Sequence, residues 1–212
     1  IPHMKLCKSI DEVFDYVNEW QDRRQDLPYG VDGLVVKVDD FNARTRLGYT
    51  IKSPRWAIAY KYQAQQAVTR LEEIQLQVGR TGRITPVAIL QPVPLSGTTI
   101  SRATLHNEDE IRRRDIRVGD QVIIEKGGEV IPKVVEVVKT KRTGQEKIFH
   151  FPKKCPICNQ TIYRLPDEAD WRCVNSSCPA QIKGSILHFA SRGAMDIEGL
   201  GQVLVDKLVD TG

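Results

Sequence analysis

The sequence predicts a protein of several small domains: an α+β segment, an all-β barrel, a four-cysteine metal module and a helical segment. Three observations predict this order. A helical hydrophobic pattern and two strand-like segments occupy the first 66 residues, five short strand-like segments follow up to residue 138, and four cysteines with metal-ligand spacing lie beyond them. A length of 212 residues allows one or two domains of ordinary size, or more if some are small modules.

The composition excludes several classes of protein. With 41% hydrophobic and 27% charged residues the chain is ordinary globular, not disordered. The net charge of +4 barely favours a polyanionic partner; basic residues cluster at 112–114 and 139–142, and each cluster fits a solvated face equally well. No apolar stretch approaches the roughly 18 residues of a membrane span, and the first residues lack a signal-peptide pattern. Cys7, left over from the metal spacing, indicates a reduced, cytoplasmic setting.

The first 66 residues predict the tail of an α+β domain. Apolar residues recur at helical spacing over 9–20, and Ser9 with Glu12 forms a capping box, so a helix is expected there. Two strands are expected around 34–38 and 56–62, joined by a loop. One helix and a few strands bury little core, so this segment is expected to be part of something larger.

Each of the two strands carries a lysine near its end, Lys37 and Lys61. Alternation places each lysine on the strand face with the smaller side chains, which leaves room for a ligand, and lysine suits phosphate as a point charge. The pair suggests one shared anion; the alternative is the solvent face of a half-exposed sheet. Asp32 either orients a lysine, binds a divalent ion or closes an Asx-turn. Arg24, eight residues earlier, lies near the expected helix end, where a cation offsets the macrodipole.

The middle of the chain predicts a small barrel. Strands are expected at residues 71–78, 84–93, 98–105, 120–126 and 130–138. Five short strands in so short a stretch favour an OB-fold. A short polar helix or turn is expected at 108–115, and residues 139–145 form a polar linker.

The cysteines carry the strongest chemical prediction. The spacing Cys155-x2-Cys158-x14-Cys173-x4-Cys178 matches a tetrahedral zinc site of four thiolates, which leaves no open coordination position, so the metal is expected to be structural. The surrounding segment has few core residues, and metal binding should therefore drive its folding. Four reduced cysteines with coincidental spacing are the alternative.

Two more helices are expected at 182–190 and 203–209, with Gly199-Leu200-Gly201 between them. This is the form of a helix-hairpin-helix unit. Its glycines would let backbone N–H groups at a helix N-terminus approach a DNA phosphate without regard to sequence. A plain turn is the alternative.

In this order, the motifs resemble those of the bacterial NAD-dependent DNA ligases, over essentially the whole chain. Residues 32–38 resemble nucleotidyltransferase motif IV, residues 56–61 resemble motif V, and residues 24–29 resemble the arginine motif upstream of them. Residues 79–88 and 97–107 are similar to the OB-fold of the family, and residues 128–132 to the OB loop that approaches DNA opposite the nick.

The resemblance implies four segments: residues 1–66 as the C-terminal part of the adenylation domain, 67–145 as the OB-fold, 146–181 as the zinc finger and 182–212 as the start of a helix-hairpin-helix domain. It implies a parent enzyme that seals nicks in three steps during DNA replication and repair. A lysine attacks NAD and takes up AMP, AMP passes to the 5′-phosphate, and the 3′-hydroxyl displaces it, with magnesium assisting.

The resemblance also implies roles for individual residues. Lys37 and Lys61 would contact NAD or AMP, with Arg24 and Asp32 supporting the phosphate and metal. Zinc would be held by the four cysteines. Residues implied to meet DNA or the nucleotide domain are Arg80, Thr81, Lys126, Val130, Ile131, Gly199 and Gly201. The expected partner is nicked double-stranded DNA, with no membrane association and a monomeric state.

One departure from the family pattern matters most. The nucleophile of the family lies in Lys-x-Asp-Gly, and the nearest string here is Gly30-Val31-Asp32-Gly33, with glycine in place of lysine. We therefore expect a middle fragment that is inactive by itself. The alternatives are a non-catalytic DNA-binding module, a related ATP-dependent nucleotidyltransferase or capping enzyme, and an unrelated zinc-ribbon protein that binds nucleic acid.

Overall fold

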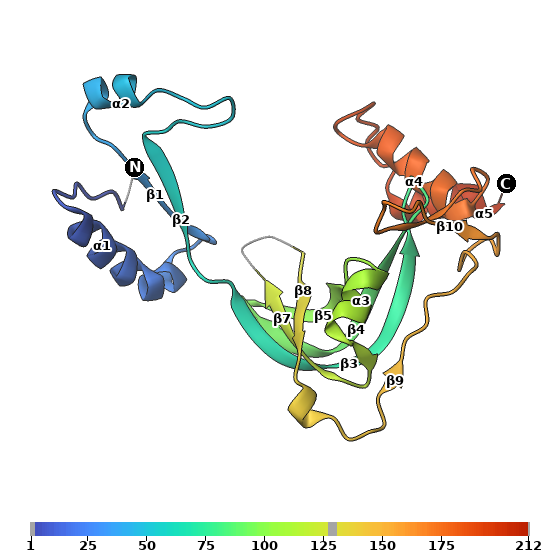
Figure 1. Ribbon diagram of the computed structural model, residues 1–212. Coiled ribbons are helices and arrows are strands. Elements are labelled where there is room, and N and C mark those ends of the chain that lie inside the picture. Colours follow the sequence, from blue (N-terminus) through green and yellow to red (C-terminus); the bar gives the residue numbers. More distant parts are fainter. Residues whose placement is uncertain (1–2, 127–130, 212) are drawn as a thin grey trace. The chain divides into compact units, whose positions relative to one another are not determined.

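The computed structural model describes residues 3–126 and 131–211 (Figure 1). The described residues form two compact units, one up to residue 65 and one from residue 66 onward. Each unit is described by itself.

The first unit begins with helix α1 (Ile10–Arg23), as the capping box predicts. The Ser9 hydroxyl accepts a 3.2 Å hydrogen bond from the amide of Glu12, and the Glu12 carboxylate accepts one of 2.8 Å from the amide of Lys8. A 3-10 turn, η1 (Arg24–Asp26), follows the helix. Val17 and Trp20 of α1 are buried against Tyr62, which gives this unit a small core.

Strands β1 (Gly33–Lys37) and β2 (Ala57–Lys61) form an antiparallel pair, as expected. The expectation of a plain loop between them is wrong, because residues 41–47 form helix α2 (Phe41–Leu47). The carboxylate of Asp40 caps it by accepting a 2.8 Å hydrogen bond from the amide of Asn42, and Gly48 ends it with a φ of 65°. Both signals, an aspartate before the helix and a glycine after it, were present in the sequence.

The second unit contains a closed five-stranded barrel, which confirms the expected OB-fold. Its strands are β3 (Gln65–Val78), β4 (Arg83–Leu95), β5 (Thr98–Thr104), β7 (Gln121–Lys126) and β8 (Lys133–Val137). They are ordered β4-β3-β7-β8-β5, and pairing of β5 with β4 closes the ring. The parallel pairing of β5 with β8, at Thr104 and Lys133, forms one side of the closure. The interior holds the largest cluster of buried residues, including Leu71, Leu90 and Val122.

Helix α3 (Glu108–Arg114) confirms the expected polar helix. The polar linker is more ordered than its composition predicts. It contains a 3-10 turn, η2 (Lys139–Lys141). Directly after the linker, β9 (Lys147–Ile148) pairs with β6 (Arg117–Val118) on the barrel.

The metal module continues the sheet of the barrel. Its strands are β10 (Ile162–Tyr163) and β11 (Trp171–Cys173), and β11 pairs with the start of β4, with Trp171 opposite Ile84. Figure 1 shows β4 reaching from the barrel to this module.

Helices α4 (Pro179–Ala190) and α5 (Gln202–Thr211) follow, close to the two helices expected. The ammonium group of Lys183 on α4 holds them together, since it lies 3.3 Å from a carboxylate oxygen of Asp206 and 2.8 Å from one of Asp210. Among the described residues, no helix has the length and apolarity to cross a membrane.

Candidate nucleotide and metal sites

The lysines of β1 and β2 lie on one face of their sheet. In the register, Lys61 is opposite Gly33 and Lys37 is opposite Ala57, so both lysines alternate to the same side. They stand at opposite ends of the ladder, about 14 Å apart along the strands at roughly 3.4 Å per residue. Both side chains can therefore contact one extended ligand, whereas meeting at a single phosphoryl group requires both to lean along the sheet.

Asp32 orients one of these lysines. Its Oδ2 atom lies 2.7 Å from the Lys61 ammonium nitrogen, in an ion pair that is more than half exposed to solvent. The hydrogen bond from Lys61 is the main reason why the pKa of Asp32 lies below its usual value. Lys37 is exposed and forms no ion pair with the described residues. The sheet thus presents one paired and one unpaired ammonium group.

Arg24 is placed by aromatic packing. Its guanidinium carbon lies 4.6 Å from the centre of the Tyr62 ring, and the Tyr62 hydroxyl donates a 3.1 Å hydrogen bond to the carbonyl of Val17. Burial raises the pKa of Tyr62, an effect that the nearby arginine partly offsets. Among the described residues no ion pair joins Arg24 to Asp32, and the contact of Arg24 with a phosphate stays a prediction.

The four predicted metal ligands come together. The sulfur atoms of Cys155, Cys158, Cys173 and Cys178 all lie within 4.8 Å of one another, and three of these cysteines are buried. Tetrahedral coordination with Zn–S bonds of about 2.3 Å places sulfur atoms roughly 3.8 Å apart, so the set fits zinc. Among the described residues this is the one His, Cys, Asp and Glu cluster with such geometry.

The turns of the module preorganise the thiols. In the first, the Cys155 amide donates to the Gln160 carbonyl at 2.8 Å, and Asn159 adopts a φ of 61°. The backbone N–H of Gln160 is the main cause that lowers the pKa of the Cys158 thiol to about 6, whereas burial raises that of Cys173 to about 12. Thiols this crowded do not all ionise unaided, and a bound dication supplies the missing stabilisation.

Side chains fasten the module to the barrel, a contact that sequence reasoning missed. The Arg164 guanidinium donates to both carboxylate oxygens of Asp109, at 3.0 and 2.5 Å. The Trp171 indole donates to Glu108, and Arg83 on β4 lies 2.9 Å from Asp170. These partners are far apart in sequence, so no local pattern indicated them.

The residues expected to meet DNA lie in three places. Arg80 and Thr81 are exposed on the turn between β3 and β4. At the end of β7, the Lys126 ammonium donates a 2.8 Å hydrogen bond to the Thr98 hydroxyl, and Ile131 is 73% exposed. Val130 lies outside the described residues.

The two glycines expected at a DNA phosphate, Gly199 and Gly201, lie in the connection between α4 and α5. Gly199 has a φ of 80°, which favours glycine, and a Cβ atom at either position would meet none of the described residues within 4 Å. The backbone at both glycines is therefore open to approach.

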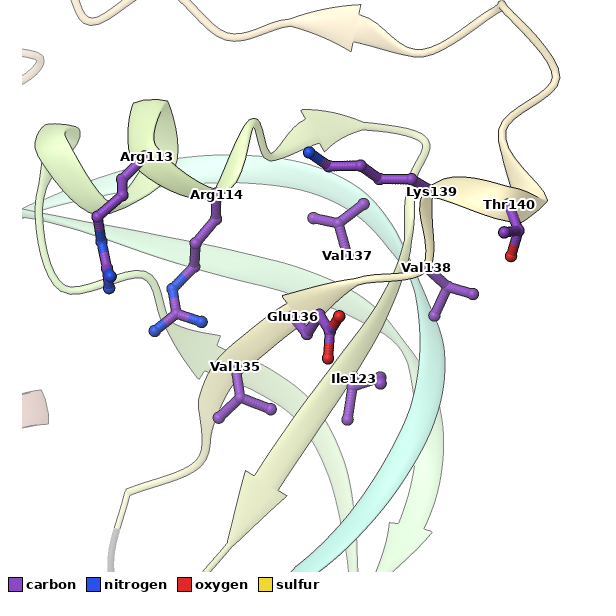
Figure 2. A pocket seen from close by; sticks show the side chains of 9 residues that line it. All are labelled: Arg113, Arg114, Ile123, Val135, Glu136, Val137, Val138, Lys139 and Thr140. Carbon is purple, nitrogen blue, oxygen red and sulfur yellow. The ribbon is translucent and has the colours of Figure 1, made fainter.

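The two basic clusters of the sequence meet at one cavity of about 510 Å³ on the barrel (Figure 2). Figure 2 shows Arg113 and Arg114 projecting from α3, while Lys139 extends toward them from the segment after β8. Both arginines are already paired, since each donates to Glu110 at 2.7 to 2.8 Å and together they lower its pKa to about 2. The single carboxylate of Glu110 therefore offsets one of the two arginine charges.

Arg142 of the second cluster is paired as well. It bonds Asp120, whose side chain is fully buried, at 2.8 Å and Asp115 at 2.6 Å. Arg142 is thus a mostly buried structural cation and not part of a solvated face, whereas the exposed Arg112 and Arg113 agree with the solvated-face interpretation.

Comparisons with known proteins identify the same domains in the same order. Three family models match in order: the NAD-dependent DNA ligase adenylation domain over residues 1–65, its OB-fold domain over 68–146 and its C4 zinc finger domain over 154–180. A protein named DNA ligase from Carboxydothermus hydrogenoformans is 56% identical over 211 residues, 100% of this chain and 32% of the relative. Those from Halalkalibacterium halodurans and Clostridioides difficile are each 53% identical, over 100% and 97% of this chain and 32% and 31% of theirs. The chain, which spans about a third of the length of these relatives, belongs to the NAD-dependent DNA ligase family.

Proposed function

We propose that the chain is a central part of an NAD-dependent DNA ligase, an enzyme that seals 5′-phosphate/3′-hydroxyl nicks in duplex DNA through AMP intermediates. The ordered match of three ligase domain models along one chain carries this proposal. The lysine-bearing sheet supports it, because it offers two ammonium groups on one face to an extended anionic ligand. We also propose that the protein acts as a monomer in the cytoplasm.

In this proposal Lys37 and Lys61 bind the phosphates of NAD or AMP, and Arg24 supports them. Cations fixed around a transferring phosphoryl group stabilise the charge that develops on its oxygens. The Lys61 ammonium pairs with Asp32 at the surface, an interaction of at most about 1 kcal/mol that leaves it able to turn to a phosphate. Magnesium, which often uses one or two carboxylates and substrate phosphates as ligands, would further neutralise the phosphoryl oxygens. Asp32 is an exposed carboxylate that fits such a role.

The second unit supplies DNA contacts in this proposal. Exposed Arg80 and Thr81 on one turn, and Lys126 and Ile131 beside the β7–β8 loop, would meet the DNA backbone. The glycines between α4 and α5 would admit a phosphate in helix-hairpin-helix fashion. Zinc, held by four cysteines with no open position, is structural.

Catalysis of the first step needs a nucleophile that this chain does not show. Glycine stands at position 30, where a Lys-x-Asp-Gly motif would place lysine. We therefore expect no covalent AMP when this chain is incubated with labelled NAD and magnesium. Covalent labelling would contradict this assignment of the nucleophile.

Sealing of a nick is tested in the longer protein that contains this chain. The expected result is sealing with NAD and none with ATP. Sealing with ATP alone would favour the related ATP-dependent nucleotidyltransferases. The second candidate, a non-catalytic DNA-binding module, is favoured by the missing Lys-x-Asp-Gly, and absence of any sealing alongside retained DNA binding would support it.

A further inference from the structure

The turn that carries Arg80 and Thr81 is held by the metal module. Within the turn, the Gly79 amide donates to the Arg83 carbonyl at 2.9 Å and the Gly82 amide to the Gly79 carbonyl at 2.9 Å. A further hydrogen bond, of 2.8 Å, runs from the amide of the metal ligand Cys173 to the carbonyl of Gly82. The turn is thus hydrogen-bonded directly to Cys173, one of the four metal ligands, at the place where β11 pairs with β4.

Gly82 makes that approach possible. Its φ of 75° lies in the left-handed region, and a Cβ atom there would lie 2.1 Å from the carbonyl oxygen of Cys173. Every other residue type would therefore both strain the backbone and collide with the metal module. The same Cys173 carbonyl accepts a 2.9 Å hydrogen bond from the side chain of Gln181, at the start of α4.

Helix α4 closes on the turn from a second side. It begins directly after the ligand Cys178, and Gly184 lies in its middle. A Cβ atom on Gly184 would lie 2.9 Å from Cβ of Arg80, 3.1 Å from its Cα and 3.2 Å from its amide nitrogen. Glycine is a poor helix former, so its presence in the middle of a helix calls for a packing reason. The backbone of Arg80 is that reason.

We propose that Gly184 is a positioning residue for Arg80, so that the four-cysteine site, through α4 and Cys173, sets how the Arg80–Thr81 turn is presented to DNA. Among the described residues Arg80 forms no ion pair, and it is exposed, so its guanidinium is available to a phosphate. The metal then influences DNA binding although it never touches DNA. This inference rests on the proposed contact of Arg80 with the DNA backbone.

The first test measures DNA binding by the zinc-loaded chain. Affinity for a nicked duplex is recorded as a function of salt for the unmodified chain, Gly184→Ala, Arg80→Ala and the double variant. The slope of log affinity against log salt is negative, and loss of one phosphate contact reduces its magnitude by about 0.9. We expect this loss for Arg80→Ala and for Gly184→Ala, with no further loss in the double variant. The control is Gly193→Ala, where a Cβ atom would contact no atom of the described part of the chain within 4 Å.

The second test does not involve DNA. Hydrogen exchange at the amides of Gly79 and Gly82 is compared with and without zinc, and in the Gly184→Ala and Gly193→Ala variants. We expect faster exchange after chelation and in Gly184→Ala, with Gly193→Ala unchanged. The thiolate spectrum of bound cobalt verifies that each variant retains its metal site. Alanine is the better helix former, so a merely local effect would instead strengthen α4.

The outcomes separate the two proposals. Unchanged exchange in the turn both after chelation and in Gly184→Ala overturns the positioning role. Faster exchange together with an unchanged salt slope in Arg80→Ala leaves the mechanical coupling standing and contradicts the DNA contact of Arg80. If the two losses of salt slope add in the double variant, Gly184 acts elsewhere than through Arg80, and the inference is overturned.

Discussion

The indole N–H of Trp171 donates a 2.7 Å hydrogen bond to Oε2 of Glu108, which joins the metal module to the first turn of α3 on the barrel. The Glu108 side chain is only 9% exposed, and its other oxygen accepts a 2.7 Å hydrogen bond from Arg112. A carboxylate this buried needs its partners. The metal module is therefore docked by this hydrogen bond as well as by apolar packing.

Replacement of Trp171 by phenylalanine removes the donor and keeps most of the ring. We expect the free energy of unfolding of the second unit to fall by about 1–3 kcal/mol, because a buried acceptor loses a partner. Urea denaturation measures it. The control is Trp56→Phe in the first unit, followed through the unfolding of that unit, since the buried indole N–H of Trp56 has no hydrogen-bond partner among the described residues. An equal loss in the two variants would assign the effect to ring size.

Substitution Cys155→Ser should abolish stoichiometric zinc binding and expose residues 153–180 to protease. Structural zinc supplies on the order of 10–16 kcal/mol of binding free energy in zinc-finger peptides, far more than this small segment could replace. Zinc content and limited proteolysis with peptide mapping provide the measurement. Cys7→Ser is the control, because Cys7 is remote in sequence and absent from the thiol cluster. Normal zinc content in Cys155→Ser would refute a four-thiolate site.

Arg142 fastens the linker after the barrel through the fully buried carboxylate of Asp120. We expect Arg142→Met to lower the free energy of unfolding by about 3–5 kcal/mol, because it leaves that charge without its cation. Chemical denaturation followed by circular dichroism measures the change. Lys139→Met, three residues away and without an ion pair among the described residues, should change it by under about 0.5 kcal/mol. The Arg117 amide also donates a 2.8 Å hydrogen bond to Oδ2 of Asp120, and similar effects of both changes would mean that this bond alone satisfies the carboxylate.

Stability should fall in acid partly through Glu110. Its two arginine partners lower its pKa from 4.5 to about 2 in the folded protein. A lowered folded-state pKa stabilises the fold above the unfolded value, and this contribution disappears as the pH falls from about 4.5 to about 2. Glu110→Gln should therefore flatten the dependence of unfolding free energy on pH in that window.

The control for this titration is Glu136→Gln, on the same cavity, because Glu136 forms no ion pair within the described residues. Its pH dependence should follow that of the unmodified chain. A curve for Glu110→Gln that stays as steep would show that solvent screens the pairs with Arg113 and Arg114.

In the longer ligase, Lys61→Ala should slow AMP transfer by about 10²-fold or more, the usual effect of removing one preorganised charge from a transferring group. Rapid-quench assays of adenylated intermediates measure the rate. The exposed ion pair with Asp32 contributes at most about 1 kcal/mol, so stability should be nearly unchanged. Lys52→Ala, in the same unit and exposed, is the control. Equal rates in the two variants would exclude Lys61 from the reaction.

Local patterns in the sequence were sufficient for much of this structure. The capping box at Ser9 predicted α1, strand alternation placed Lys37 and Lys61 on one face, and the cysteine spacing predicted the thiol cluster. Each of these depends on residues that are close together in the chain or on the two-residue alternation of side chains along a strand.

Other features needed the folded chain. The bond between Arg164 and Asp109 joins residues 55 positions apart, and no periodicity connects them. The pairing of Arg142 with Asp120, 22 positions away, likewise needed the folded chain, whereas Glu110 with Arg113 and Arg114 are i,i+3 and i,i+4 pairs that the expected helix already implied. The close contact of Gly184 with Arg80 was invisible for the same reason.

Strand β4 serves two modules, because residues Arg83 and Ile84 at its start pair with the finger while the remainder builds the barrel. If recombination in the linker exchanged the metal module between related ligases, the module would lose the strand on which it was selected to dock. The barrel and the metal module should therefore evolve together, and substitutions at the start of β4 should co-vary with those in β11.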